Sequence, residues 1–153
     1  MKPTKLFVDL DGVLADFDRG VEIVTGRRPD QLSTKEMWRA LSREPDFFGA
    51  LGLMVDAKEL WAHCRPHHPV ILTGLPIGTW AAPQKRRWVA NMLGEDVEVI
   101  TCMSRDKPDW SAPGHVLVDD REKTKAGWEA KGGTFILHRT AAESIAALKA
   151  LGL

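Results

Sequence analysis

The sequence predicts an α/β fold: a doubly wound parallel sheet with a small helical cap inserted after the first strand. Short apolar runs alternate with stretches of helical pattern over most of the 153 residues, which is typical of a parallel sheet covered by helices on both faces. The stretch between the first two runs is too long for a single crossover helix. Polar residues directly follow several runs, at the end where open α/β sheets place their sites.

Five apolar runs are the predicted strands. The first contains Leu6, Phe7 and Val8 and runs to about Asp9, and its uninterrupted apolar character suits a strand buried on both faces. Right-handed crossovers between parallel strands leave only a few possible topologies. The other four strands are expected, in chain order, at 69–73, 97–101, 115–118 and 134–137.

The helices are predicted from start and stop patterns. Asp16 precedes a helical pattern that ends near Gly26, because a carboxylate suits a helix start and glycine a helix end. Ser33 and Glu36 have the spacing of a capping box, and Asp56 suits the N-cap of a third helix. Later helices are expected over 82–93, 122–131 and 141–151. The chain thus divides into a core of residues 1–14 and 68–153 and a cap of residues 15–67, above the carboxyl end of the sheet.

Composition argues against several classes of function. Lys plus Arg and Asp plus Glu number 21 each, and zero net charge argues against a nucleic-acid polymer or an anionic membrane as the main partner. No apolar run approaches the roughly 20 residues of a membrane span, and we expect no signal peptide, since the N-terminus enters a strand at once. The two cysteines, Cys64 and Cys102, lack metal-site spacing. We therefore expect two free, buried thiols in a cytoplasmic protein.

Polar residues follow four of the predicted strands. Because the carboxyl ends of parallel strands face the same way, these residues are expected to share one crevice beneath the cap. Each feature alone is weak, because the first acids could form a solvated Asp-Gly turn. Their joint occurrence in this order predicts a functional site. In chain order they are Asp9 and Asp11, Thr73 and Gly74, Arg105 and Lys107, and Asp119 and Asp120.

The chemistry open to this set is narrow. Several carboxylates around one point attract a hard divalent cation such as Mg²⁺, and a phosphate can then approach carboxylates that would otherwise repel it. Lys107 and backbone N–H groups near Gly74 would neutralise the remaining phosphate charge. One carboxylate can attack phosphorus, and a second can protonate the leaving oxygen and then activate water. A small phosphorylated molecule is therefore the expected substrate.

These residues resemble, in order, the four motifs of the haloacid dehalogenase-like (HAD) superfamily, over residues 5 to 121: Asp9-Leu10-Asp11-Gly12-Val13, Thr73, Lys107 and Asp119-Asp120. The resemblance implies a HAD-like Rossmannoid core with strand order 3-2-1-4-5. It implies that Asp9 is the nucleophile and Asp11 the general acid/base, and that Thr73 and Lys107 bind the phosphoryl group. Mg²⁺ would be held by Asp9, the backbone carbonyl of Asp11, and one of Asp119 and Asp120. Asp11 favours a phosphatase, because ATPases of the superfamily carry Thr at that place.

The sequence also resembles the narrower 5′(3′)-deoxyribonucleotidase-like family, in residues 11–17, 46–48, 104–107 and 116–121. That resemblance implies a nucleoside monophosphate as substrate, with Phe17 stacked on the base and Arg105 helping to hold phosphate. The sequence departs from the family after Thr73, where Gly74-Leu75-Pro76 replaces a small polar residue followed by Pro.

Three alternatives remain at this point. The chain could be a phosphatase for a sugar phosphate or another small metabolite, or a relative that only binds ligands. It could also be a phosphoaspartate signalling domain of receiver type, although receivers carry adjacent acids after the first strand, whereas here the adjacent pair follows the fourth.

Several other side chains could serve the same site. Lys85 rivals Lys107 as the phosphate-binding lysine, but Lys85-Arg86-Arg87 is interpreted as a solvated helix face. Trp61 and Trp88 are expected in the core. The aromatic residues of the cap, Trp38, Phe47 and Phe48, are candidates for substrate contact.

Overall fold

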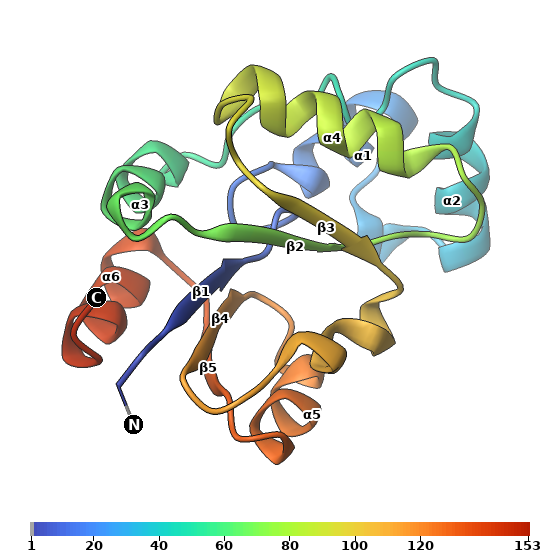
Figure 1. Cartoon of the computed structure of the whole chain (residues 1–153). Coiled ribbons are helices and arrows are strands. Elements are labelled where there is room, and N and C mark those ends of the chain that lie inside the picture. The colour runs from blue at the N-terminus through green and yellow to red at the C-terminus, as the bar shows by residue number, and fades with distance from the viewer. Residues whose placement is uncertain (1) are drawn as a thin grey trace.

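Five parallel strands form one sheet in the order β3-β2-β1-β4-β5, as the computed structural model of the chain shows for residues 2–153 (Figure 1). Phe7 of the central strand pairs with Val70 on one side and with Leu117 on the other. The predicted fold class and strand order are confirmed. The strands are β1 (Lys5–Val8), β2 (Val70–Gly74), β3 (Val99–Cys102), β4 (His115–Asp119) and β5 (Thr134–Leu137).

Six α-helices accompany the sheet: α1 (Phe17–Thr25), α2 (Thr34–Ser42), α3 (Ala57–Cys64), α4 (Ala81–Met92), α5 (Lys125–Ala130) and α6 (Ala141–Ala150). Four short 3₁₀ helices lie at Pro29–Gln31, Arg65–His67, Ser104–Trp110 and Glu122–Thr124. No helix in the described part of the chain is long and apolar enough to cross a membrane.

Both faces of the sheet are covered, because successive side chains of a strand point to opposite faces. Leu6 and Val8 of β1 belong to the larger apolar cluster, which also holds buried residues of α3, α4 and α6. Phe7, between them, belongs to the smaller cluster and packs edge-on against Trp128 of α5, with ring centroids 5.5 Å apart. The unbroken apolar character of β1 in the sequence reflects this burial on two sides.

The predicted start and stop residues of the first helices are in place. The Asp16 side chain accepts a hydrogen bond from the backbone N–H of Arg19, and Gly26 ends α1 with a φ of 76°. Such a left-handed turn favours glycine, which has no Cβ to clash. Ser33 accepts a hydrogen bond from the backbone N–H of Glu36 at the start of α2.

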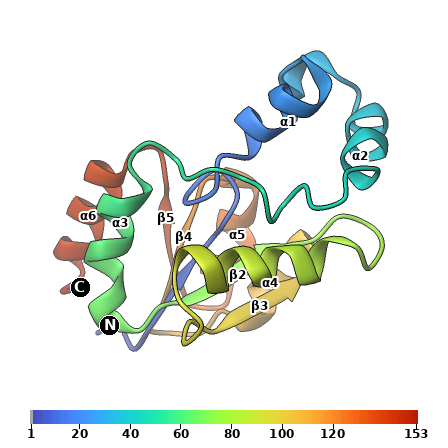
Figure 2. The ribbon, with the colours of Figure 1, turned by 90° about the horizontal axis from the view of Figure 1, so that it is seen from above.

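The insertion predicted over 15–67 divides into two parts. α1 and α2 pack on each other, whereas α3 packs on α6, and Figure 2 shows α3 beside α6 and away from the other two. The side chain of Asp56 contributes to this arrangement, because its Oδ2 accepts a hydrogen bond from the backbone N–H of Ala141 at the start of α6, at 2.7 Å. We therefore use "cap" below for the segment that holds α1 and α2 and ends before α3.

The two connections between cap and core are bonded to each other. The backbone N–H of Asp16 donates to the carbonyl of Gly52 at 2.9 Å, and that of Met54 donates to the carbonyl of Leu14 at 2.8 Å. The outgoing and returning chains thus lie side by side, and they place the cap next to the turn that follows β1.

Both cysteine thiols are free in the described residues, as predicted. Cys64 is buried, and burial raises the pKa of its thiol to about 12, whereas Cys102 is half-buried.

Replacement of Asp56 tests whether α3 belongs to the core. Asp56→Ala removes the acceptor for the first N–H of α6, and loss of such a cap costs about 1 kcal/mol of unfolding free energy. Urea denaturation followed by circular dichroism measures it. Lys58→Ala, an exposed neighbour on α3, should change the free energy by less than about 0.5 kcal/mol. Equal values for both variants would contradict the contact.

Candidate active site

Asp9 and Asp119 lie side by side because their strands are neighbours. Val8 of β1 pairs with Val118 of β4, so the next residue of each strand reaches the same edge of the sheet. The backbone N–H of Asp9 donates to the carbonyl of Val118 at 2.9 Å, and both carboxylates are buried. The sequence prediction that these strand ends converge is thus correct in the structure.

Gly12 allows the turn after β1 to pack against Asp120. Its φ is 80°, and a Cβ at this position would lie 2.1 Å from Oδ2 of Asp120. A residue with a side chain would therefore meet both backbone strain and a steric clash. The Asp-Gly pattern in the sequence therefore forms a turn, and this turn is also part of the site.

Three carboxylates gather at this point, those of Asp9, Asp119 and Asp120, with oxygens all within 4.8 Å of one another. Burial and the charge of Asp9 raise the pKa of Asp119 to about 6. Loss of water around the carboxylate and the charge of Asp9 raise the pKa of Asp120 to about 8, although part of this residue stays exposed. Crowded carboxylates of this kind repel one another, and their oxygens are the ligands that Mg²⁺ prefers. The set therefore fits a hard divalent cation.

Lys107 lies between two of these acids. Its Nζ donates to Oδ1 of Asp9 at 2.9 Å and to Oδ2 of Asp119 at 2.8 Å. Burial alone would raise the pKa of Asp9, but the charge and hydrogen bond of Lys107 outweigh it and hold that pKa below its usual value. Burial likewise would lower the pKa of Lys107, and the two carboxylates raise it instead. Asp9 is therefore an ionised carboxylate, as a nucleophile must be.

Asp11 is held by the second lysine. Nζ of Lys85 donates to Oδ2 of Asp11 at 2.8 Å, to Oγ1 of Thr73 at 2.9 Å and to the carbonyl of Gly74 at 2.6 Å. The interpretation of Lys85 as part of a solvated helix face is wrong, because Lys85 is only 1% exposed. It is correct for Arg86 and Arg87, which are exposed.

The other oxygen of Asp11, Oδ1, is buried and has no hydrogen-bond partner among residues 2–153. Burial raises the pKa of Asp11 above its usual value, although the charge of Lys85 opposes this. A carboxyl group with a raised pKa that lies at a cavity can act as a general acid.

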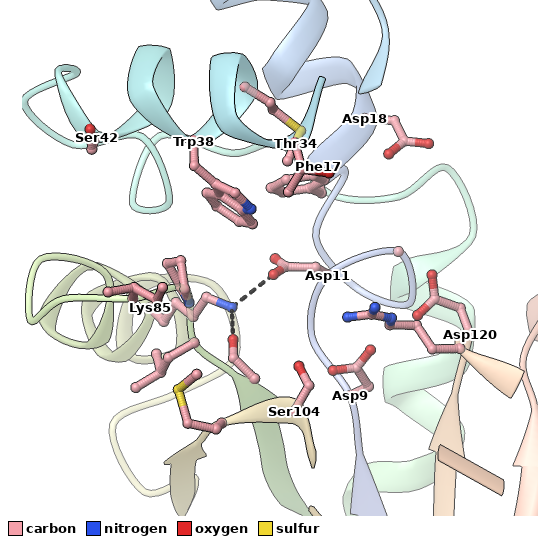
Figure 3. Close-up of a pocket in the computed structure, with 18 of the residues that line it drawn as sticks. Asp9, Asp11, Phe17, Asp18, Thr34, Trp38, Ser42, Lys85, Ser104 and Asp120 are labelled. Atoms are coloured by element: carbon pink, nitrogen blue, oxygen red, sulfur yellow. Dashed lines mark hydrogen bonds and ion pairs between the residues drawn. The ribbon is translucent and has the colours of Figure 1, made fainter. Parts of the chain in front are cut away.

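These groups open onto a cavity of about 1380 Å³ between cap and core. Leu75 and Pro76 after β2 and Trp80 at the start of α4 form part of its wall. Figure 3 shows its two sides, with cap residues Phe17, Thr34 and Trp38 facing core residues Asp9, Asp11, Lys85 and Ser104.

An aromatic cluster forms the cap side of the cavity. Phe17 stacks on Phe48, with ring centroids 6.2 Å apart and an interplanar angle of 20°. Trp38 lies 5.8 Å from Phe17 and 6.3 Å from Trp80, measured between centroids. Phe17, Trp38 and Trp80 line the cavity, whereas Phe47 and Phe48 are buried behind them. Trp61 and Trp88 are core residues, as predicted.

Not all predicted site residues reach the cavity. Gly74 and Lys107 line it, whereas Thr73 is buried beneath Lys85, and Arg105 is exposed and is not among the described lining residues. The phosphate-binding roles of Thr73 and Arg105 stay predictions. Sequence analysis considered Lys85 but preferred Lys107, and it assigned no site role to Trp80 or Arg121; these three residues line the cavity.

Helical spacing could have identified Lys85. Ala81, Trp88 and Val89 lie four residues before and three and four residues after it, and residues at these spacings share one face of a helix. All three are buried, so the periodicity places Lys85 on the buried face of α4 in spite of the two arginines that follow it.

Comparison with known proteins establishes the fold. No family model and no curated protein matches the sequence. A solved HAD-superfamily hydrolase from Ehrlichia chaffeensis matches with a TM-score of 0.61 and 13% identity over 100% of both chains. A HAD family enzyme from Bacteroides thetaiotaomicron, in complex with magnesium and inorganic phosphate, matches with a TM-score of 0.51 and 13% identity over 90% of this chain and 95% of that chain.

An L-2-haloacid dehalogenase from Xanthobacter autotrophicus also matches, with a TM-score of 0.54 and 16% identity over 87% of this chain and 76% of that chain. The structural neighbours are thus HAD-superfamily hydrolases, and this chain has their α/β Rossmannoid fold. Identities this low do not distinguish one activity of these hydrolases from another.

Addition of Mg²⁺ should stabilise the protein against unfolding, because a cation relieves the repulsion among three carboxylates. Stabilisation reaches about 2.7 kcal/mol when free Mg²⁺ is about 100 times its Kd. Asp120→Asn should lose most of this gain and should be no less stable than wild type in EDTA. Asp18→Asn, which alters an acid of the cavity wall outside the cluster, should keep the full gain. Urea denaturation with and without Mg²⁺ measures both, and an unchanged gain in Asp120→Asn would contradict the site.

Proposed function

We propose that the protein is a Mg²⁺-dependent phosphomonoester hydrolase that works through an aspartyl-phosphate on Asp9. One observation carries the proposal. An ionised Asp9, hydrogen-bonded to Lys107, and Asp11, with one unpaired oxygen, both line the same cavity. A nucleophile and a proton donor at one cavity are the two groups that such a reaction requires.

The carboxylates fit the metal that the reaction needs. Asp9, Asp119 and Asp120, with the backbone carbonyl of Asp11, would hold Mg²⁺, which when bound supplies positive charge that lets a phosphate approach these acids. Lys107 uses two of its three ammonium N–H groups on Asp9 and Asp119. The third has no partner among the described residues, so Lys107 can donate to a phosphoryl oxygen.

In the first step, a carboxylate oxygen of Asp9 attacks phosphorus and forms a new P–O bond. The bond from phosphorus to the leaving oxygen breaks with its electron pair, and the proton of Asp11 moves to that oxygen to give a neutral alcohol. In the second step Asp11, now ionised, takes a proton from water, and the oxygen of that water attacks phosphorus. Asp9 is released as a carboxylate together with inorganic phosphate, and Asp11 carries its proton again.

The acids favour a phosphatase over a dehalogenase, the activity named for one structural neighbour. A halide leaves without a proton, so a dehalogenation does not need the acid that Asp11 provides. A complex with magnesium and inorganic phosphate among the neighbours agrees with the phosphatase proposal.

The aromatic wall favours a nucleoside monophosphate as the substrate. Phe17 and Trp38 line a cavity of about 1380 Å³, and aromatic rings accept a nucleobase by stacking. A substrate with its phosphate at Asp9 would extend toward the cap, where these rings lie (Figure 3). A phosphatase for a sugar phosphate remains the alternative, because the polar half of the site would serve it equally well.

Asp9→Asn should abolish turnover, since a neutral amide is not a nucleophile toward a phosphate. We expect a loss of more than about 100-fold in kcat, and acid-quenched enzyme should no longer carry labelled phosphate from the substrate. Asp18→Asn, with the same chemical change at the cavity wall, serves as the control. Residual activity above a hundredth of wild type would count against Asp9 as the nucleophile.

Nucleoside monophosphates should be hydrolysed with a kcat/KM about tenfold above that of ribose 5-phosphate, because stacking of one base contributes roughly 1–3 kcal/mol. Phe17→Leu should narrow this ratio, and Ile23→Leu, at an exposed position of the same helix, should leave it unchanged. If nucleotides turn over no faster than p-nitrophenyl phosphate, the nucleotide proposal fails and the sugar phosphate alternative is favoured.

A further inference from the structure

We propose that Lys85 is a positioning residue that fixes the carboxyl group of Asp11 in the orientation from which it transfers a proton to the leaving group of the substrate. The inference rests on the proposed phosphatase function and deepens it. Lys85 belongs to α4 and Asp11 to the turn after β1, 74 residues apart in the sequence, so only the folded chain brings them together.

The donors of Lys85 are fully used by the protein. An ammonium group has three N–H donors, and those of Lys85 go to Asp11, Thr73 and the carbonyl of Gly74 at 2.6–2.9 Å. No donor remains for a phosphoryl oxygen, which separates the role of Lys85 from that of Lys107. What Lys85 can do is orient the groups that accept its hydrogen bonds.

The position of Lys85 is itself fixed by its neighbours. Oε1 of Gln84 accepts the backbone N–H of Phe48 at 2.9 Å, and the indole N–H of Trp88 donates to the carbonyl of Leu51 at 2.8 Å. Nζ of Lys85 also lies 4.5 Å from the ring centroid of Phe48, within the range of a cation–π contact. Phe48 and Leu51 of the segment that returns from the cap therefore hold α4 on both sides of Lys85. The ammonium group of Lys85 is thus a fixed anchor for Asp11.

The anchor fixes the carboxyl group of Asp11 at the wall of the cavity. Oδ2 accepts the hydrogen bond from Lys85, and Oδ1 is the buried oxygen without a partner among residues 2–153. With Oδ2 held by Lys85, the plane of the carboxyl group is fixed where Asp11 lines the cavity. Without Lys85 the carboxyl group of Asp11 can rotate about its Cβ–Cγ bond. Proton transfer from Asp11 to the leaving group is then the step that becomes slower. Asp9 keeps its hydrogen bond from Lys107, so its attack on phosphorus does not depend on Lys85.

Leaving groups of graded basicity test this division of roles. p-Nitrophenolate departs readily without a proton, phenolate less so, and the alkoxide of benzyl phosphate requires one, while the three substrates have similar size. For Lys85→Met we expect kcat/KM to fall about 100-fold on benzyl phosphate, as for loss of a general acid, and less than about fivefold on p-nitrophenyl phosphate. Arg86→Met, the exposed neighbour on the same helix, should match wild type on all three.

An equal loss on the three substrates would overturn the inference, because a merely structural role does not depend on the leaving group. In an Asp11→Asn background, Lys85→Met should cause no further loss beyond about twofold, and a full additional loss would also overturn it. If Lys85→Met lacks a cooperative thermal transition, Lys85→Arg takes its place with the same graded pattern expected. If the wild type hydrolyses no phosphomonoester, the proposed function itself fails. If the wild type is active but the loss in Lys85→Met is the same for every leaving group, only the role of Lys85 is refuted.

Discussion

Balance of buried charge is the constraint on which the rest of the site depends. Four acidic side chains, those of Asp9, Asp11, Asp119 and Asp120, lie close to only two buried ammonium groups, those of Lys85 and Lys107. An unpaired charge away from water costs more free energy than most single contacts return. Burial and the charge of Asp9 raise the pKa values of Asp119 and Asp120, and a divalent cation would offset the charge of these acids. The same imbalance that disfavours the metal-free fold is what makes the site suitable for phosphate chemistry.

The two lysines divide the site into two halves with different chemistry. Lys107 comes from the 3₁₀ segment after β3 and joins Asp9 to Asp119, the half that would act on phosphorus in the proposed reaction. Lys85 comes from α4 and joins Asp11 to the end of β2, the half that would act on the leaving group in the proposed reaction. Since each lysine bonds one acid of the turn after β1, the central strand positions both halves.

The sequence could predict the parts that follow from the backbone. Asp9 and Asp119 end neighbouring parallel strands, so their convergence requires only the strand order. Lys85 was predicted on the solvated face of α4 because Arg86 and Arg87, which follow it, hide the helical periodicity of the buried residues. Its partner Asp11 is also 74 residues away in the sequence. The place of α3 was missed for a similar reason, because the length of an insertion does not show which of its helices packs on the core. Arg105 has the expected position in the chain but an exposed side chain, which spacing alone does not reveal.

The cap and the chemistry are not independent in this fold. Phe48 touches the aromatic cluster of the cap on one side and Lys85 on the other, and its backbone is bonded to α4 through Gln84. A change at Phe48 therefore disturbs both the wall of the cavity and the anchor of Asp11. Trp38, in contrast, has aromatic contacts and faces the cavity, with no bond to the acids. Under the proposed function, Trp38 and Phe17 are therefore the side chains at which a substitution would change substrate preference and leave the acids in place.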